Sequence, residues 1–346
     1  MIPQIKIKNR SIGENEEPLV IAEIGINHEG SIDKAVKMVD DAFDAGCECV
    51  KFQCHVIEDE MTLDAKRVIP GNATESIWEI MDRCKLSEEE DSTLKTYVES
   101  KGMLYLSTPF SRAAAERLQK LGVEAFKIGS GECNNYPLIE HIAKYGKPII
   151  LSTGMNDIET VGISVNIFKK YKVPYALLHC TSIYPTPYDK VRLKAIWELE
   201  KAFPGACVGL SDHSIGNYTC LGAVALGACI LEKHFTSDKS WPGPDVSISM
   251  DPNELKDLIL GSKAIFQALK GKKSILPEEK PTIDFAYASV VSIVKIKQGE
   301  VFSRSNIWVK RPGTGGILAK ELNAILGKRA ACDILEDQQL SWKMIE

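Results

Sequence analysis

Runs of apolar residues, each ending in polar residues and followed by a segment of helical periodicity, repeat along most of the chain. The runs are continuous rather than alternating, which is typical of parallel strands that helices cover. Eight runs predict strands, at residues 19–25, 47–53, 103–110, 125–132, 148–155, 175–185, 207–214 and 231–236. Helices are predicted at residues 32–45, 87–101, 112–121, 138–145, 158–171, 221–230 and 252–270. This alternation, at about 30 residues per unit, predicts an α/β fold that closes as a (β/α)8 TIM barrel.

A doubly wound open sheet is the alternative architecture. No GxGxxG motif follows any of the predicted strands, which speaks against that alternative. Residues 5–13 alternate weakly and predict a short strand or hairpin before the barrel, and Ser31 is the expected N-cap of helix 32–45. The long connection over residues 55–86 carries an acidic run at 58–60, and insertions of that length are usually functional.

The composition and the hydrophobic pattern of the chain change after residue 270. Residues 271–284 are rich in Lys, Glu and Pro and are expected to form an exposed linker. The remainder has short predicted strands at 289–294 and 307–310, separated by turns. We therefore predict a barrel domain over 1–270, a linker over 271–284 and a small domain over 285–346. A core of that size is marginal alone, so the small domain is expected to dock on another surface.

Composition excludes several classes of partner. The formal net charge is -5, with 44% hydrophobic and 26% charged residues, which argues against a nucleic acid or a membrane held by bulk electrostatics. No secretory signal is visible, and the longest small-apolar run, 221–231, is too short to span a bilayer. The ten cysteines form no CxxC pair and are expected to be reduced and buried. A cytoplasmic protein is the expectation.

Two histidines stand at the ends of consecutive predicted strands, His213 and His234. Because the carboxyl ends of barrel strands meet at one mouth, both imidazoles are expected at the same rim, flanked by Asp212, Glu232 and Asp245. Two satisfied histidines near a surface are the alternative interpretation. Two neutral imidazoles on a divalent ion would leave positions open for substrate oxygens, so Mn²⁺, Mg²⁺ or Co²⁺ is favoured over structural zinc.

Lysines and hydroxyl groups also stand at the predicted strand ends. Lys51 and Lys127, together with a ring of Ser and Thr residues, suit a phosphate plus a carboxylate. The alternative is that each lysine lies at an edge with its ammonium group in solvent. A Schiff-base aldolase with Lys127 as the covalent lysine remains open, and borohydride trapping would detect it.

Motifs along nearly the whole chain resemble those of sialic acid synthases, the family of N-acetylneuraminate, legionaminate and pseudaminate synthases. They include EIGINHEGS (23–31), KFQ (51–53), STPFSR (107–112), KIGSGECNNYPLI (127–139), HCTSIYPTP (179–187), GLSDHS (209–214), LEKHFT (231–236) and PGPD (242–245). The tail, with WVKRPGTGG (308–316), resembles the antifreeze-protein-like (SAF) domain of that family. An ice- or carbohydrate-binding module on a scaffold barrel is the non-enzymatic alternative, and the polar strand ends speak against it.

The resemblance implies a metal-dependent transferase that condenses phosphoenolpyruvate with N-acetylmannosamine and water, releasing phosphate and giving N-acetylneuraminate. A diacetamido-dideoxyhexose is the alternative acceptor. The implied phosphoenolpyruvate contacts are Lys51, Thr108, Lys127, Ser130, Ser152, Ser182 and Ser211. The implied sugar contacts are Gln53, Asn72, Tyr184, Asp245 and Arg311. Mn²⁺ would be bound by His213 and His234, and Glu23 and Glu132 are the candidates for proton transfer or water positioning.

On the same resemblance, Arg311 reaches the mouth of the partner subunit in a domain-swapped homodimer. The chain departs from close bacterial N-acetylneuraminate synthases at Ser182, at Phe52 and over residues 237–241, SDKSW. The last of these departures concerns a loop beside the sugar, so it bears on the identity of the hexosamine.

Overall fold

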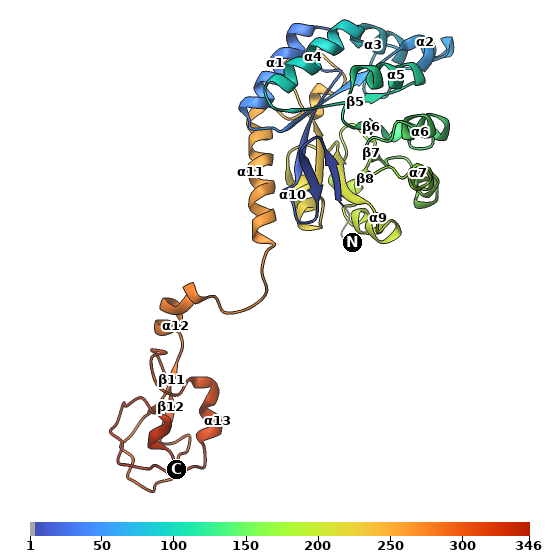
Figure 1. Cartoon of the computed structure of the whole chain (residues 1–346). Coiled ribbons are helices and arrows are strands. Elements are labelled where there is room, and N and C mark those ends of the chain that lie inside the picture. The colour runs from blue at the N-terminus through green and yellow to red at the C-terminus, as the bar shows by residue number, and fades with distance from the viewer. Residues whose placement is uncertain (1–3) are drawn as a thin grey trace. The chain divides into compact units, whose positions relative to one another are not determined.

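The computed structural model describes residues 4–346, which divide into two compact units (Figure 1). The first unit ends at Lys270 and the second begins at Gly271. Each unit has its own hydrophobic core, so each is described by itself. No helix within residues 4–346 is both long enough and apolar enough to cross a membrane.

Eight parallel strands form the centre of the first unit and confirm the predicted (β/α)8 architecture. The ladder runs in the order β5-β4-β3-β10-β9-β8-β7-β6, and its two end strands, β5 and β6, pack side by side, so the barrel is nearly closed. The strands are β3 (Leu19–Gly25), β4 (Cys49–Cys54), β5 (Leu104–Pro109), β6 (Phe126–Ile128), β7 (Ile149–Ser152), β8 (Tyr175–Cys180), β9 (Cys207–Asp212) and β10 (Ile230–His234).

Helices surround this barrel (Figure 1). They are α1 (Ile32–Asp44), α2 (Ile57–Glu60), α3 (Ile77–Cys84), α4 (Glu88–Ser100), α5 (Arg112–Leu121), α6 (Tyr136–Ala143), α7 (Ile158–Tyr171), α8 (Tyr188–Val191), α9 (Ala195–Ala202), α10 (Tyr218–Ala225) and α11 (Pro252–Ala268). Local sequence fixes several helix starts. The Ser31 side chain accepts a hydrogen bond from the Lys34 backbone N–H, which confirms the predicted cap, and Ser87 forms a capping box with Glu90.

Two apolar layers hold the barrel together. The outer layer fills the space between strands and helices. The inner layer joins Leu19 and Ile230, at the starts of β3 and β10, to Ile5, Ile7 and Ile12 of the hairpin β1 (Gln4–Ile7) and β2 (Arg10–Gly13). The hairpin therefore closes the amino-terminal end of the barrel, and the carboxyl ends of the strands are left to form the mouth.

The structure differs from the sequence prediction in local detail. Strand β6 ends at Ile128, and residues 130–132 form a 3₁₀ turn instead of continuing the predicted strand to 132. Helix α9 was not predicted, because it spans only eight residues between Pro187 and Pro204 and its periodicity is hard to see. Helix α10 begins at Tyr218, three residues before the predicted start.

The second unit contains α12 (Lys280–Ala286), the antiparallel pair β11 (Ser289–Ser292) and β12 (Ile307–Lys310), and α13 (Leu322–Ile325). Its core includes Val290, Ile296, Phe302 and Ile307. Residues 280–284, placed in the linker by the sequence, belong to α12. All ten cysteines of the chain are free and nine are buried, as expected from their spacing.

Candidate active site

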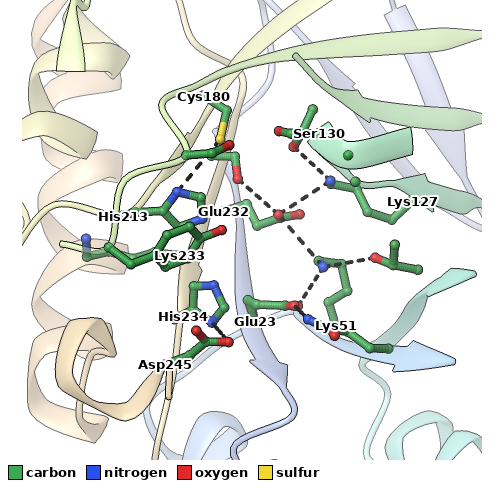
Figure 2. A pocket seen from close by; sticks show the side chains of 18 of the residues that line it. Glu23, Lys51, Lys127, Ser130, Cys180, His213, Glu232, Lys233, His234 and Asp245 are labelled. Atoms are coloured by element: carbon green, nitrogen blue, oxygen red, sulfur yellow. Dashed lines mark hydrogen bonds and ion pairs between the residues drawn. The ribbon is translucent and has the colours of Figure 1, made fainter. Parts of the chain in front are cut away.

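A cavity of about 380 Å³ opens at the carboxyl ends of the barrel strands (Figure 2). It gathers nearly all of the site residues predicted within the barrel. They are Glu23, Lys51, Gln53, Asn72, Thr108, Lys127, Ser130, Ser152, Ser182, Tyr184, Ser211, His213, His234 and Asp245. The cavity is also lined by residues outside the predicted set, among them Cys180 and Glu232.

Lys51 lies between two buried carboxylates. Its Nζ is 2.7 Å from Glu23 Oε2 on β3 and 3.8 Å from Glu232 Oε1 on β10, and it donates a hydrogen bond to Thr108 Oγ1 at 3.1 Å. Burial alone would lower the pKa of this ammonium group, but the two carboxylates outweigh burial and raise it. The positive charge of Lys51 is therefore stabilised at the bottom of the mouth.

Lys127 provides the second cation. Its Nζ donates to Ser152 Oγ at 2.8 Å and to the Ile128 carbonyl at 3.0 Å, and lies 3.6 Å from Glu232 Oε1. Burial lowers the pKa of Lys127, Lys51 lowers it further, and Glu232 only partly opposes this. The pair thus presents one ammonium whose charge is secured and one whose charge depends on Glu232.

The loop after β7 approaches the hydroxyl groups closely. The Gly154 backbone N–H donates to Ser130 Oγ at 3.0 Å. A Cβ atom placed on Gly154 would lie 2.5 Å from Ser182 Oγ and 2.8 Å from Ser130 Oγ, closer than real contacts allow. Only glycine fits here without displacing both hydroxyls, so backbone and hydroxyl groups form one continuous polar wall beside Lys127.

The carboxylates divide into two charge states. Burial raises the pKa of Glu23, and the neighbouring charge of Glu232 raises it further, although Lys51 opposes the shift. Burial also acts against the charge of Glu232, but Lys127 and Lys51 outweigh it and lower its pKa. Glu232 is therefore the ionised partner of the two lysines, and Glu23 is the carboxyl poised to exchange a proton.

Glu232 is the main site residue outside the predicted substrate and metal contacts. The sequence indicates it only as an acid that flanks the histidines. Residues two apart on a strand point to the same face, so Glu232 shares the inward face of β10 with His234. Its Oε1 also accepts a hydrogen bond from Ser211 Oγ at 3.2 Å. The same periodicity that placed His234 at the mouth could have placed Glu232 there.

His213 and His234 are brought together as predicted. Their ring centroids are 5.5 Å apart, and the Tyr184 ring stacks on His213 at 4.2 Å (Figure 2 shows both histidines on one wall). His213 Nδ1 lies 3.0 Å from the Thr181 carbonyl oxygen. Since a carbonyl only accepts, Nδ1 carries the proton in this contact and Nε2 is free to bind a cation when the ring is neutral.

These two residues fit a metal with an open coordination sphere. Burial and the charge of His213 hold the pKa of His234 well below its usual value, so its imidazole is neutral, and its buried Nδ1 has no hydrogen-bond partner among residues 4–346. No group of three or more His, Cys, Asp or Glu side chains in that described range could hold a metal. A cation bound here would take its remaining ligands from water or substrate.

Cys180 adds a thiol to the histidine wall. Its Sγ is 3.8 Å from His213 Nδ1. Burial raises the pKa of the thiol, but the charge of His213 outweighs burial and the net pKa is lowered. Burial in turn lowers the pKa of His213, and Cys180 reverses this to give a value of about 9, so a cation that binds to this ring must displace its second proton. Cys180 was predicted only as a buried strand cysteine.

The rest of the mouth includes two amide side chains and one carboxylate. Gln53 Nε2 donates to Glu23 Oε1 at 3.1 Å, and Asn72 Nδ2 donates to Asp245 Oδ1 at 3.3 Å. Asp245 Oδ2 is 3.9 Å from His234 Nδ1. Burial raises the pKa of Asp245, while His213 and Asn72 oppose the shift.

Two predicted residues are not found in this cavity. Glu132 lies in the 3₁₀ turn after β6, where its Oε2 accepts a hydrogen bond from Asn135 Nδ2 at 2.5 Å, and it is absent from the residues that line the mouth. Burial raises its pKa and Glu60 adds to the increase. Arg311 follows β12 in the second unit and is exposed.

Comparison with known proteins identifies the family. Residues 38–274 match the NeuB family and residues 287–346 match the SAF domain. The chain is 40% identical to an uncharacterized protein of Methanocaldococcus jannaschii, over 98% of both chains. It is 38% identical to N,N'-diacetyllegionaminic acid synthase of Campylobacter jejuni, over 93% of this chain and 98% of that one.

A solved structure agrees with these matches. The N-acetylneuraminic acid (sialic acid) synthetase of Leptospira borgpetersenii, in complex with citrate, superposes with a TM-score of 0.75 at 34% identity, covering 82% of this chain and 96% of that chain. The barrel match spans most of the first unit, and the SAF match lies wholly within the second. The chain therefore belongs to the NeuB family of sialic acid synthases and carries a C-terminal SAF domain.

Proposed function

We propose that the protein is a phosphoenolpyruvate-condensing transferase that makes a nine-carbon 2-keto sugar acid from phosphoenolpyruvate, an open-chain N-acetylhexosamine and water, with release of phosphate. N-acetylmannosamine is the first candidate acceptor. A diacetamido-dideoxyhexose is the second, favoured by the 38% identity to a diacetyllegionaminic acid synthase. The observation that carries the proposal is the pairing of Lys51 and Lys127 with a hydroxyl-lined wall in one buried mouth.

The lysine wall suits phosphoenolpyruvate because this substrate carries a phosphate and a carboxylate close together. Lys51 and Lys127 provide two cations that share Glu232, and Thr108, Ser130, Ser152, Ser182 and Ser211 provide hydroxyl groups. Charge-assisted hydrogen bonds from ammonium groups to such anions are about twice as strong as neutral ones. The buried position strengthens them further because water is excluded.

The remaining wall suits a neutral acceptor. Gln53, Asn72 and Tyr184 offer uncharged polar groups and Asp245 offers a carboxylate, whereas the lysines that line the mouth are each paired with a buried carboxylate. The adjoining outer cavity, which shares Asn72, contains Arg83, and this guanidinium is already paired with Glu29 and Glu75. We therefore propose that the acceptor is not phosphorylated.

A divalent cation held by His213 and His234, with Mn²⁺ preferred over Mg²⁺ and Co²⁺, would supply Lewis acidity toward the acceptor's carbonyl oxygen. The protein's own groups then have defined tasks. The Lys51 and Lys127 ammonium groups hold the phosphate and carboxylate so that the enol carbon faces the acceptor. Glu23 is the proposed proton-transfer group, because burial raises its pKa and so favours the form that carries a proton. Glu132, in the 3₁₀ turn after β6, remains the second candidate, and burial raises its pKa as well.

The test is phosphate release from phosphoenolpyruvate against a panel of acceptors. The panel contains N-acetylmannosamine, its 6-phosphate, and diacetamido-dideoxyhexoses of both configurations. We expect release with one or more unphosphorylated acceptors, loss of activity in EDTA, and recovery on adding Mn²⁺. Preference for the 6-phosphate would contradict the neutral acceptor. No release with any member would overturn the proposal.

A pyruvate aldolase is distinguished in the same assay. Burial lowers the pKa of Lys127, and this is also what a Schiff-base lysine requires. Borohydride added with pyruvate should leave no adduct on Lys127 if the proposal is correct. A trapped adduct, with activity that survives EDTA, would replace the transferase by the aldolase.

A further inference from the structure

A buried histidine lies immediately behind the acceptor wall and has no assigned role. His55 directly follows β4, the strand that carries Lys51 and Gln53, and only 2% of its surface is exposed. Its Nε2 is 3.0 Å from Gln53 Oε1, and its Nδ1 is 2.8 Å from Glu60 Oε2 on α2. The ring stacks on Phe110 with centroids 4.7 Å apart and planes within 11°.

The contacts form a chain that ends at the proposed proton-transfer group. Glu60 faces His55, His55 faces Gln53, and the Gln53 Nε2 donates to Glu23 Oε1 at 3.1 Å. The nitrogen end of the Gln53 amide faces Glu23, whose Oε1 accepts its hydrogen bond. The oxygen end then needs a donor, and the ring N–H of His55 is the donor placed there.

This series of contacts favours one of the two orientations that the Gln53 side-chain amide could adopt. Rotation by 180° about the last bond would exchange the amide oxygen and nitrogen at almost no steric cost. In the turned orientation the amide oxygen would face the Glu23 carboxyl, and two amide hydrogens would face the His55 N–H. The contact with Glu23 is unfavourable while that carboxyl is ionised, and the contact with His55 is unfavourable while Nε2 carries the ring proton, so the pairing with His55 favours the observed orientation.

We propose that His55, held by Glu60, is a positioning residue that fixes the Gln53 amide for the acceptor. Gln53 is half-buried and lines the mouth, and one of its two amide hydrogens is used by Glu23. The second hydrogen is left for an oxygen of the acceptor, a hydroxyl or an acyl carbonyl. The inference rests on the proposed function, because it takes Gln53 to contact the acceptor rather than phosphoenolpyruvate.

His55→Phe is the sharpest test because phenylalanine keeps the ring and its stack on Phe110 while removing both ring nitrogens. We expect the acceptor KM to rise about tenfold, the effect of one lost hydrogen bond, with the phosphoenolpyruvate KM changed less than about twofold. Gln53→Ala should give the same split, and the double variant should be no worse than Gln53→Ala. An unchanged acceptor KM in His55→Phe, or losses that multiply in the double variant, would overturn the proposal.

Two further variants keep the test decisive. His179→Phe replaces another buried histidine, whose Nε2 contacts the Val191 carbonyl at 2.6 Å, and should not raise the acceptor KM selectively. Glu60→Gln removes the charge behind His55 without emptying the ring's pocket. It should give a smaller version of the same split, and it replaces His55→Phe if that variant does not fold. No selective rise in Glu60→Gln would then overturn the proposal.

A substrate-free measurement separates this inference from the proposed function. In protein labelled with ¹⁵N-glutamine, the Gln53 side-chain amide is identified as the signal that Gln53→Ala removes. His55→Phe should shift this signal and speed its hydrogen exchange, whereas His179→Phe should not. If the wild type releases no phosphate, the proposed function fails, and this measurement still decides the positioning role. An unchanged Gln53 signal in His55→Phe would overturn it.

Discussion

Glu232 determines the charge of the proposed phosphoenolpyruvate wall, because it is the carboxylate that both lysines of that wall share. Its Oε1 lies 3.8 Å from Lys51 Nζ and 3.6 Å from Lys127 Nζ. It raises the pKa of both ammonium groups, and only Lys51 has Glu23 beside it at 2.7 Å. The charge of Lys127 is consequently the more sensitive of the two.

As pH rises, Glu232→Gln should therefore lose phosphoenolpyruvate binding at a lower pH than the wild type does. Without the carboxylate, burial and Lys51 lower the pKa of Lys127 further, so its positive charge is lost earlier as pH rises. The check is kcat/KM for phosphoenolpyruvate across pH in both proteins. We expect the alkaline limb to shift to lower pH in the variant, while the acceptor KM serves as internal reference. An alkaline limb that stays in place would show that Glu232 does not control Lys127.

Residue by residue, the sequence predicted strand-end groups well and supporting groups poorly. Lys51, Lys127, His213 and His234 stand out because a charged or imidazole side chain ends an apolar run, and all four line the mouth. His55 gave no such signal, because its role depends on α2 returning Glu60 to the ring. Contacts of that kind depend on loop geometry, which the pattern of apolar positions does not specify.

Among the elements, the loop between β7 and α7 is the one most tightly constrained by the site. Gly154→Ala should raise the phosphoenolpyruvate KM about tenfold or more, since the added methyl group displaces the Ser182 and Ser130 hydroxyls. The acceptor KM should change little. Gly162→Ala, in helix α7 after the same loop, is the matched control, because a Cβ there makes only an ordinary contact with Phe203 at 3.8 Å. Equal effects of the two alanine substitutions would contradict the role of Gly154 in placing the Ser130 and Ser182 hydroxyls.

Helix α4 carries a buried carboxyl group whose effect on the stability of the protein depends on pH. Asp91 is 1% exposed, with Arg117 Nη1 of α5 at 3.4 Å. Burial raises its pKa to about 6, against 3.8 for the ordinary group, although Arg117 opposes the shift. Because the folded-state pKa is raised, the group's contribution to stability is fully present below pH 3.8 and is lost as pH rises through 6.

Asp91→Asn should accordingly gain stability relative to the wild type as pH rises. Between pH 5 and 7.5 the difference in unfolding free energy should move in favour of the variant by about 1.4 kcal/mol. Urea unfolding of the two proteins at both pH values measures this difference. Glu89→Gln, at an exposed position of the same helix, is the control, since solvent screens its charge. A pH-independent difference would mean that Asp91 stays ionised when buried.

Element type was more predictable than element boundaries. All eight strands were expected, since continuous apolar runs of four to eight residues identify buried parallel strands. The end of β6 was missed because Gly129 and Ser130 continue the apparent strand in sequence while the backbone turns into a 3₁₀ helix. That turn directs Ser130 into the mouth, so the local departure from strand geometry is part of the site.

At the scale of the whole molecule, Arg311 belongs to the second unit, whereas the mouth is formed by the first unit. The residue is exposed in the second unit, and we propose that it serves the acceptor wall of a second copy in a domain-swapped homodimer. The lysines that line the mouth are each paired with a buried carboxylate, Lys51 with Glu23, Lys127 with Glu232 and Lys233 with Asp212. Arg311→Ala should then raise the acceptor KM far more than the phosphoenolpyruvate KM.

Complementation tests whether Arg311 acts between chains. Arg311→Ala keeps an intact barrel, whereas His234→Ala keeps Arg311 but has a disabled mouth. In a co-expressed and doubly tagged heterodimer, the intact barrel would receive Arg311 from the His234→Ala chain. Half of the sites should then work with the wild-type acceptor KM, although each parent homodimer is impaired. If Arg311 acted within its own chain, every site would lack either Arg311 or His234, and the heterodimer would recover nothing.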